Sequence, residues 1–456
     1  MFIFTLMIVL FLIGYTVIAL EHPLKINKTA TALLLGVVLW VCAVSGGQGI
    51  LVDTSALRDF QMSNPGSTFT DWLVHSQLIH ALGDIAEILF FLMGAMTIVE
   101  LIDTEGGFRI ITDRISTTNK VKLLWVTSIL AFFMSAVLDN LTTSIVMVAL
   151  LRKLIGDRHD RWFFASMVIV AANAGGAWSP IGDVTTIMLW IAGRVTTEYV
   201  VLECFLPSLI SMIIPLIVVS FVEKGEIDAS LRPKDLENEG LPIWQRNLIF
   251  FLGVAALVFV PVFKILTHLK PYMGIMLGLS VLWIVTEILS QANKDKDMIH
   301  YTIAGALTRI DLPSILFFLG ILLAVSGLQS AGHLSLLAAG LDSTFNGNYY
   351  LIDTVIGILS SVIDNVPLVA AAMGMYSFPV DHMFWIFLAY CAGTGGSLLI
   401  IGSAAGVAVM GMEKIDFIWY LKKITPYALL GYLAGAGCYV LLNNYVFHSA
   451  MTAVAG

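Results

Sequence analysis

The chain has 456 residues, of which 58% are hydrophobic and only 12% are charged, and its formal net charge is −8. Its mean hydropathy of +0.90 lies far outside the range of soluble globular domains. There is no polybasic tract, and the four cysteines all fall in apolar segments. These features argue against a nucleic-acid-binding protein, a disulfide framework and a cysteine-based metal site.

Long apolar stretches recur along the chain, whereas alternating strand patterns do not. In lipid only helices or closed barrels satisfy the backbone, so the pattern predicts an all-α polytopic membrane protein. The N-terminal run lacks a basic region and a cleavage site, which predicts a retained helix. The expected spans are 2–20, 29–47, 83–104, 162–193, 201–222, 246–263, 271–290, 310–330, 383–412 and 424–442.

Two further segments, 121–155 and 349–377, are predicted to enter the membrane and turn back as re-entrant hairpins. The arms of the second, 349–363 and 366–377, are shorter than the roughly 17–25 residues with which a helix crosses a bilayer. The arms of the first segment, 121–155, are long enough to cross the bilayer. Its assignment as a re-entrant hairpin therefore rests on its correspondence with the second segment, 349–377.

Three short motifs of the first half return in the same order in the second half. The sequence ILFFL at 88–92 returns at 315–319, Asp139-Asn140 returns as Asp364-Asn365, and the glycine-rich stretch 174–183 returns at 394–403. The offsets are roughly 227, 225 and 220 residues, as duplicated halves would leave. We therefore divide the chain into repeats at 1–222 and 246–456, joined by a polar cytoplasmic linker at 223–245.

Lysine and arginine are distributed unevenly among the predicted connections. The connections 331–348 and 377–382 and the tail 443–456 contain neither residue, whereas most other connections are basic. The positive-inside rule then places both termini outside the cytoplasm and gives each half five spans plus one hairpin. The two repeats are inverted in topology, with broken helices at the midplane. Residues 48–82 form an outside insertion, with an interfacial helix expected around Trp72 to Leu82.

Two acidic residues, Asp139 and Asp364, each stand beside an asparagine inside an apolar run. A charge at membrane depth costs several kcal/mol or more, so two such pairs in matching halves indicate ion handling. The oxygen atoms of the Asp-Asn tips, Asp139-Asn140 and Asp364-Asn365, suit Na⁺. The alternative is that both pairs are only N-caps of the helices that follow, an interpretation that Pro367 favours.

A second constellation lies in the predicted span 162–193. Its glycines and Pro180 break the helix and free backbone groups near the bilayer centre, which Asp183 would face. The alternative is a simple kink in which Thr185 or Thr186 satisfies Asp183.

From these patterns we expect Asp139, Asp183 and Asp364 to exchange the proton for the ion. Glu87 is a candidate for the proton path, with a solvated carboxylate as the alternative. The residues expected to coordinate or orient are Asn140, Thr142, Thr143, Asn173, Ser179, Thr186, Ser360, Asn365, Thr394 and Ser403.

The stretches 135–144, 173–186 and 360–367 resemble hallmark sequences of the NhaD-type sodium/proton antiporters of the ion transporter superfamily, and 21–28 fits that family as well. The resemblance runs from about residue 15 to about residue 442. It implies exchange of Na⁺, or Li⁺, for H⁺ by alternating access in a scaffold-plus-transport fold, with elevator-like movement and a homodimer. The related dicarboxylate symporters carry serine at both hairpin tips, where this chain has Asp139 and Asp364.

Electrostatics favour a cation independently of the resemblance. Three acidic groups at one cavity repel an anion, and burial favours the protonated carboxyl, so Na⁺ and H⁺ compete for the same oxygens. The open alternatives are a Na⁺- or H⁺-coupled dicarboxylate or arsenite-type carrier of the same superfamily, and a proton-channel subunit of a membrane complex.

The sequence contains no nucleophile–base pair or metal motif of the kind that enzymes use, so neither catalysis nor a cofactor is expected. The expected partners are Na⁺ or Li⁺, H⁺, the lipid bilayer and a second copy of the chain, with no nucleic acid. Without a transit peptide, the expected location is a bacterial inner membrane.

Overall fold

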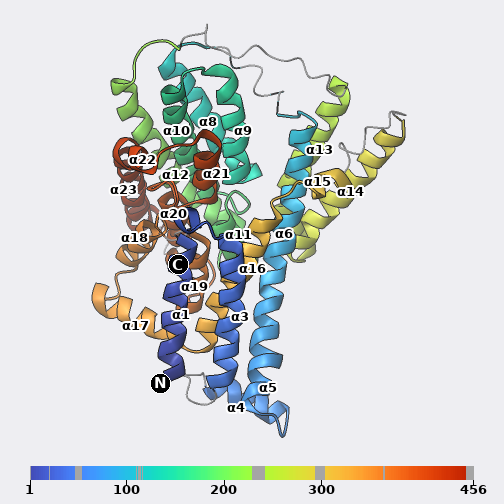
Figure 1. The fold of residues 1–456 in the computed structure, drawn as a ribbon, viewed down its shortest axis with the longest axis vertical. Helices are drawn as coiled ribbons and strands as arrows, with labels where there is room; N and C mark the ends of the chain where they lie inside the picture. The colour runs from blue at the N-terminus through green and yellow to red at the C-terminus, as the bar shows by residue number, and fades with distance from the viewer. Residues whose placement is uncertain are drawn as a thin grey trace. The chain divides into compact units, whose positions relative to one another are not determined.

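The computed structural model describes residues 2–19, 21–46, 54–108, 110, 115, 117–227, 242–292, 303–362 and 365–447. Within these ranges every regular element is helical, and the extended backbone forms one isolated bridge, between Asn119 and Glu226 (Figure 1). The prediction of an all-α membrane protein is confirmed.

The helices follow the predicted spans closely. In chain order they are α1 (Phe2–Ala19), α2 (Glu21–Leu24), α3 (Lys28–Gly46), α4 (Thr54–Ser63), α5 (Phe69–Trp72), α6 (Ile79–Thr104), α8 (Lys120–Leu138), α9 (Asn140–Leu154), α10 (Arg158–Ala177), α11 (Val184–Ile191), α12 (Thr197–Val222), α13 (Ile243–Thr267), α14 (Pro271–Ala292), α15 (Ile303–Leu307), α16 (Leu312–Ser330), α17 (His333–Phe345), α18 (Tyr349–Leu359), α19 (Asn365–Met375), α20 (Met383–Gly395), α21 (Ala404–Glu413), α22 (Phe417–Lys423) and α23 (Thr425–Leu442).

Eight helical segments in the described ranges are long and apolar enough to cross a membrane. The predicted spans 162–193 and 383–412 are not continuous helices but pairs, α10 with α11 and α20 with α21, as the glycine-rich stretches predict. Both predicted hairpins also divide at their Asp-Asn tips, into α8 and α9 and into α18 and α19. Helix α17, within the connection 331–348, was not predicted.

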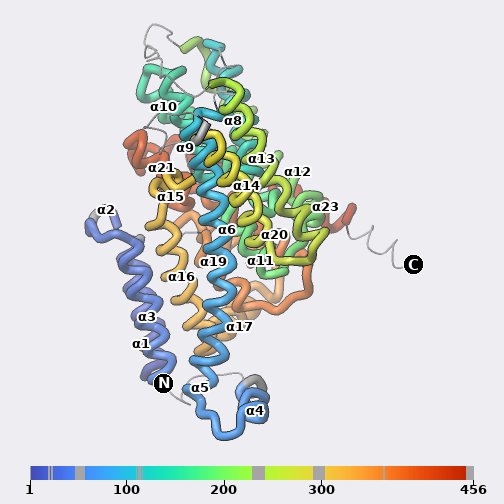
Figure 2. Tube along the Cα trace, turned by 90° about the vertical axis from the view of Figure 1, so that its right-hand side faces the viewer, coloured from blue at the N-terminus to red at the C-terminus, as the bar shows by residue number. Residues whose placement is uncertain are grey.

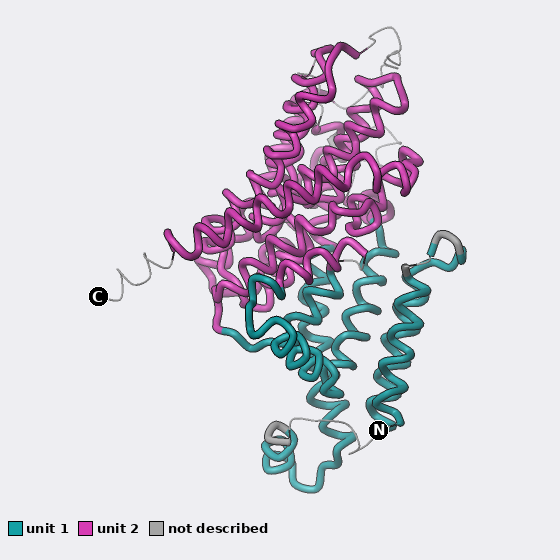
Figure 3. Tube along the Cα trace, turned by 90° about the vertical axis from the view of Figure 1, so that its left-hand side faces the viewer, with its two compact units in different colours: residues 1–92, 311–352, 366–378 teal, residues 93–310, 353–365, 379–456 magenta. Residues whose placement is uncertain are grey.

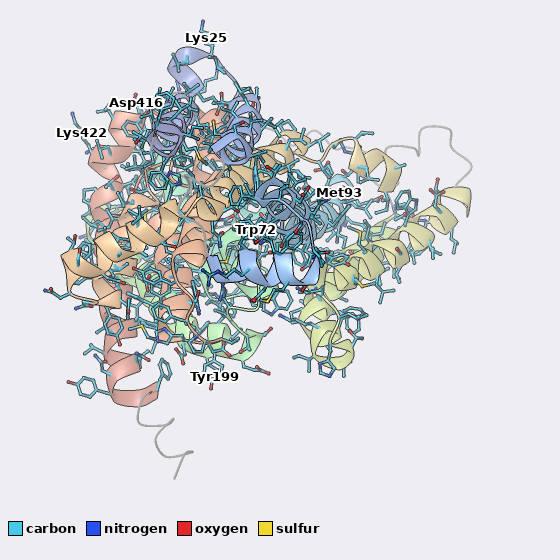
Figure 4. The ribbon with its side chains drawn as sticks, turned by 90° about the horizontal axis from the view of Figure 1, so that it is seen from below. Lys25, Trp72, Met93, Tyr199, Asp416 and Lys422 are labelled. Carbon is cyan, nitrogen blue, oxygen red and sulfur yellow. The ribbon has the colours of Figure 1, made fainter. Side chains whose placement is uncertain are left out.

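The separate helix expected around Trp72 to Leu82 is instead the first part of a longer one. Thr68 and Asp71 form a capping box that starts α5, and a π-helical turn at Leu73–Leu78 leads directly into α6. No proline interrupts 72–83, so every backbone N–H in this stretch can continue the helix. The tube in Figure 2 follows this helix to Thr104. Trp72, labelled in Figure 4, is buried beside Phe69.

The chain forms two compact units that do not coincide with the two sequence halves (Figure 3). Unit 1 comprises 1–92, 311–352 and 366–378, and unit 2 comprises 93–310, 353–365 and 379–456. Met93, labelled in Figure 4, begins unit 2 in the middle of α6. Each unit therefore draws on both halves of the sequence.

Unit 1 is built around the close packing of α3 on α16. A Cβ atom added at Gly36 would lie 2.6 Å from the carbonyl oxygen of Gly320, so the two backbones approach directly at small residues. The indole nitrogen of Trp40 donates to the carbonyl oxygen of Leu323 over 3.0 Å. Small residues and one indole hydrogen bond thus fix this helix pair.

Unit 2 contains the first hairpin, both broken helices and α12, α13, α14 and α23. Helix α10 approaches α8 so closely that a Cβ at Gly175 would overlap the carbonyl oxygen of Phe132. Helix α20 approaches α18 in the same way, because a Cβ at Gly395 would overlap the carbonyl oxygen of Gly357. Glycine is required at both positions by the opposing backbone.

Further contacts recur between the halves at the same sequence offsets. The Ser135 hydroxyl donates to the carbonyl oxygen of Ala172 over 2.6 Å, and the Ser360 hydroxyl donates to that of Ala392 over 3.3 Å. The first residues of these pairs are 225 apart and the second are 220 apart, as in the sequence motifs. Each hairpin arm therefore packs on its own broken helix through the same backbone contacts.

An ion cluster around the buried Glu413, at the end of α21, joins the two sequence halves inside unit 2. The Glu413 carboxylate accepts from Arg152 Nε and from Arg161 Nε, each over 2.6 Å. The indole of Trp162 donates to the carbonyl oxygen of Glu413 over 2.9 Å. The C-terminal end of α21 is thereby attached to α9 and α10.

Replacing Gly175 by alanine should destabilise the protein by about 1–3 kcal/mol, because the new methyl group meets backbone that cannot rotate away. The measurement is thermal unfolding of the purified protein in detergent. The control is Gly437→Ala in α23, where nothing lies within 4 Å of the added Cβ. That variant should stay within about 1 kcal/mol of wild type or be slightly more stable. Equal stabilities of the two variants would contradict the proposed close contact.

Candidate functional site

The first hairpin tip is a single residue, Asp139, between α8 and α9. Its backbone angles, φ 79° and ψ 162°, fall in a region that is essentially restricted to glycine. Its carboxylate caps α9 by accepting from the Thr142 backbone N–H over 2.7 Å and from the Thr142 hydroxyl over 3.1 Å. The strained backbone of Asp139 at this helix break distinguishes the tip from an ordinary N-cap.

Asn140, the next residue, connects the tip to the broken helix. Its amide nitrogen donates to Asp183 Oδ2 over 2.5 Å and to Asn173 Oδ1 over 2.9 Å. All three side chains are buried, with at most 4% of the residue exposed. The structure therefore brings together three of the residues that the sequence selected independently.

Asp183 also caps α11, because its Oδ1 accepts from the backbone N–H and the hydroxyl of Thr185 over 2.9 and 2.8 Å. The kink interpretation of Asp183 is therefore correct as far as Thr185 is concerned, but it is incomplete, since Oδ2 faces Asn140. Thr186 donates instead to the carbonyl oxygens of Gly176 and Asp183, over 3.3 and 3.1 Å. Both roles of Asp183, cap and network member, coexist.

The break itself is held against the hairpin. The hydroxyl of Ser179 donates over 2.5 Å to the carbonyl oxygen of Ala136, in the last turn of α8. A Cβ on Gly182 would lie 2.8 Å from the carbonyl oxygen of Ser135. Ser179 and Gly182 therefore set the distance between tip and break.

The network continues into the second half through Asn173, whose amide nitrogen donates to Ser403 Oγ over 3.0 Å. Ser403 is the N-cap of α21 and holds the place that Asp183 holds at α11. Asn140, Asn173 and Ser403 thus form one hydrogen-bonded chain. Its last link joins Asn173 and Ser403, which are 230 residues apart in the sequence. Two other predicted residues donate to backbone carbonyl oxygens outside this chain. Ser360, just after α18, donates to Gly357 over 2.7 Å as well as to Ala392, and Thr394 of α20 donates to Tyr390 over 2.6 Å.

The second hairpin tip is described only in part. Asp364 lies outside the described residues, and its partner Asn365, the first residue of α19, is buried. In the first tip the hydroxyl oxygens of Thr143 and Ser144 are buried without a hydrogen-bond partner among the described residues. Buried oxygens without a hydrogen-bond partner need an explanation, and a bound cation that takes oxygen ligands is one such explanation.

Glu87 lies in α6 within unit 1, half-buried, whereas the network belongs to unit 2. The structure thus assigns the predicted proton-path residue and the predicted exchange residues to different units.

Among the buried acids that the sequence analysis missed, two stand in the interior of apolar helices. Asp353 in α18 is fully buried, and Glu203 in α12 is buried with Tyr439 Oη 3.3 Å from its Oε2. Each stands in an apolar helix, which was the available signal, but neither belongs to a repeated motif. A search for acidic residues in repeated motifs therefore missed both.

The donor set of the network consists of carboxylate, amide and hydroxyl oxygens. In the described part of the chain no group of three His, Cys, Asp or Glu side chains could hold a metal ion. The arrangement is unlike a zinc or iron site and matches the oxygen ligands that hard cations take.

Discontinuous helices that meet at buried polar residues in a polytopic helical protein define the class of secondary transporters. Comparison with known proteins places the chain within this class. The citrate transporter family matches residues 8–387. The Alcanivorax borkumensis YdaH transporter, whose crystal structure shows an unusual topology, has a TM-score of 0.53 at 11% identity, over 92% of this chain and 99% of that one. That likeness concerns the fold alone.

Two relatives narrow the assignment. Sodium/proton antiporter 1 of Arabidopsis thaliana is 46% identical over 98% of this chain and 74% of its own length. The Na⁺/H⁺ antiporter NhaD of Alkalimonas amylolytica is 31% identical over 97% of this chain and 91% of its own length. The chain therefore belongs to the citrate transporter family and, within it, groups with the NhaD-type sodium/proton antiporters.

One buried carboxylate lies outside the spanning helices. Glu105 follows the end of α6, is 4% exposed, and neither of its carboxylate oxygens has a hydrogen-bond partner among the described residues. Burial raises the pKa of Glu105 from 4.5 to about 8, although the nearby positive charge of Arg309 acts in the opposite direction. Arg309 itself pairs with Glu100 over 2.8 Å.

Glu105 should make stability depend on pH. Because its pKa is higher in the folded than in the unfolded state, its contribution is fully present below about pH 4.5 and is lost as pH rises through about 8. Glu105→Gln, which cannot ionise, should therefore have a higher free energy of unfolding than wild type at pH 9, by up to about 5 kcal/mol, and should differ little from it at pH 5. A stability difference that does not change with pH would contradict the burial of this carboxyl.

The backbone of Asp139 generates a second prediction. Asp139→Gly relieves the strained φ and loses only part of the cap, so it should be as stable as wild type or more stable, by up to about 2 kcal/mol. Asp139→Asn keeps the strain and should be no more stable than wild type. Unfolding in detergent distinguishes them, and a glycine variant less stable than the asparagine variant would show that the tip is unstrained.

Proposed function

We propose that this chain exchanges Na⁺, with Li⁺ as an alternative, for H⁺ across a membrane by alternating access. The observation that carries the proposal is the buried network in which Asn140 joins Asp183 and Asn173 beside the strained Asp139. The names of the relatives support the same ions.

The two carboxyls supply the competition that exchange requires. Asp139 is close enough to Asp183 for their charges to interact. Two carboxylates in a dry site repel each other, so binding a proton or a cation there is favourable, and both cannot occupy the same oxygens. If this site opens to one side at a time, uptake of one ion requires release of the other.

The chain offers oxygen ligands for the cation at the first tip. Asn140 forms its two hydrogen bonds through its amide nitrogen, which leaves its amide oxygen for an ion, and the Thr143 hydroxyl oxygen is unpartnered among the described residues. We propose that these two atoms and the Asp139 carboxylate coordinate Na⁺, and that Asp364 and Asn365 complete the site.

The remaining predicted residues orient this set. Thr142 holds the Asp139 carboxylate, and Asn173 fixes the amide of Asn140. We assign positioning roles also to Ser179, Thr186, Ser360, Thr394 and Ser403 because each holds a helix break or a hairpin arm through a hydrogen bond.

We further propose that the two halves are inverted repeats, that both hairpins are re-entrant, and that the hairpins and broken helices move in an elevator-like manner in a homodimer. The recurrence of the glycine and serine contacts at offsets of 225 and 220 residues supports the repeat. The uneven lysine and arginine distribution supports termini outside the cytoplasm. A bacterial inner membrane is the proposed location.

A coupled carrier of citrate-like anions is the second candidate, because the matching family is described as a citrate transporter. The network argues against it, since Asp139 and Asp183 would repel a carboxylate substrate and no basic side chain takes part in the network's hydrogen bonds among the described residues.

The test is dye-reported proton movement in everted vesicles on addition of Na⁺, Li⁺, K⁺ or citrate across a pH series. Wild type should respond to Na⁺ or Li⁺, and Asp139→Asn and Asp183→Asn should fall at least about tenfold below it, because each loses a titrating carboxyl. The control is Asp416→Asn, which removes an exposed capping carboxylate of α22, labelled in Figure 4. Full exchange in both site variants, or a response to citrate alone, would overturn the proposal.

A further inference from the structure

Asp353 is a buried acid that the proposed exchange site does not use. It lies in α18, the helix that leads to the second hairpin tip, and its relative exposure is 0%. Neither carboxylate oxygen has a hydrogen-bond partner among the described residues. It belongs to unit 2, as the network of Asn140 and Asp183 does.

The neighbours of Asp353 are titratable groups that are already engaged. Cys391 of α20 and Tyr432 of α23 lie close enough to interact with it electrostatically. The Tyr432 hydroxyl donates to the carbonyl oxygen of Thr354 over 2.8 Å, and the Cys391 thiol lies against Tyr432 and Thr354. The hydroxyl hydrogen of Tyr432 is therefore directed away from Asp353.

Among the described residues, no positive charge compensates this carboxyl. Helices α20 and α23 contain no Asp, Glu, Lys, Arg or His within their bounds, and Asp353 is the only charged residue of α18. The next titratable groups are Tyr390 of α20, Cys438 of α23, and Cys204 and the acidic Glu203 of α12. These groups are all neutral or acidic.

The packing also excludes a hydration shell. One turn after Asp353, a Cβ at Gly357 would lie 2.5 Å from the carbonyl oxygen of Cys391 and would overlap the Tyr432 hydroxyl. An ionised carboxylate with neither water, donor nor counter-ion costs several kcal/mol, so this environment accommodates only the neutral, protonated acid.

We propose that Asp353 is a second proton-binding site of the exchanger, filled in the conformation described here and emptied when the transport cycle brings water to α18. The inference rests on the proposed Na⁺/H⁺ exchange. No covalent chemistry is involved, because the carboxyl binds one proton and later releases it. The protein would then carry one proton more per cycle than the cation site alone exchanges.

The test measures the number of protons exchanged per Na⁺ by the full-length protein in proteoliposomes. At a fixed Na⁺ gradient, the pH gradient at which net flux stops gives the ratio. Asp353→Asn should lower the ratio by one and weaken the dependence of the rate on membrane potential. The matched control is Ser128→Ala, which removes a buried, unpartnered hydroxyl 225 residues earlier in α8 and should leave the ratio unchanged.

The outcomes separate the two proposals. Wild type without Na⁺-dependent proton flux overturns the proposed function itself. Exchange in wild type at one proton per Na⁺, or at the same ratio in Asp353→Asn, overturns only the role of Asp353.

A second measurement applies to the unmodified protein, in case Asp353→Asn does not fold. Dicyclohexylcarbodiimide, an apolar reagent that reacts with protonated carboxyls, is added to proteoliposomes during turnover, and the labelled peptides are mapped by mass spectrometry. We expect an adduct on Asp353 whose yield decreases as the pH is raised, because proton release then becomes more favourable. No adduct on Asp353 at any pH of the series would overturn the proposal.

Discussion

The structure depends on one constraint: an ionised side chain in an apolar, helical interior needs a hydrogen-bond partner or a counter-ion. In unit 2 the helices stop where Asp139 and Asp183 lie, and each carboxylate caps the helix that begins after it. The helix ends and the carboxylates therefore stabilise each other. Because Asn140 takes the remaining oxygen of Asp183, the two breaks become one site and cannot be considered separately.

This interdependence explains why small residues surround the site. Gly175 and Gly395 allow two helix backbones to touch, and Ser135 and Ser360 bridge the same pairs by hydrogen bonds. Backbone contact of this kind leaves little freedom for side-chain repacking, so a hairpin arm and its broken helix behave as one body. The proposed cation site would benefit, because side-chain ligands that are anchored to a fixed backbone keep their mutual distances.

Much of this arrangement could be predicted from the sequence. Apolar length defined the spans, the glycine-rich stretches located the breaks, and the repeated Asp-Asn pairs selected Asp139 and Asn140. Three-dimensional pairing could not be read in this way: nothing in the sequence indicates that Asn173 links Asn140 to Ser403, because that contact depends on how α10 and α21 pack. Asp353 was missed for a different reason, since it has no acidic counterpart at residue 128 and repetition was the criterion. The long helix at 69–104 was divided because Gly83 and the polar residues before it resemble a boundary.

The cluster around Glu413 has a consequence for biosynthesis. Arg152 and Arg161 precede Glu413 by 261 and 252 residues. At roughly 5–20 residues per second, a ribosome adds the glutamate some tens of seconds after the arginines. During that interval neither guanidinium group has Glu413 to pair with, so the three-residue ion cluster cannot yet form. The attachment of α21 to α9 and α10 is therefore completed late in synthesis, long after the two arginines have been added.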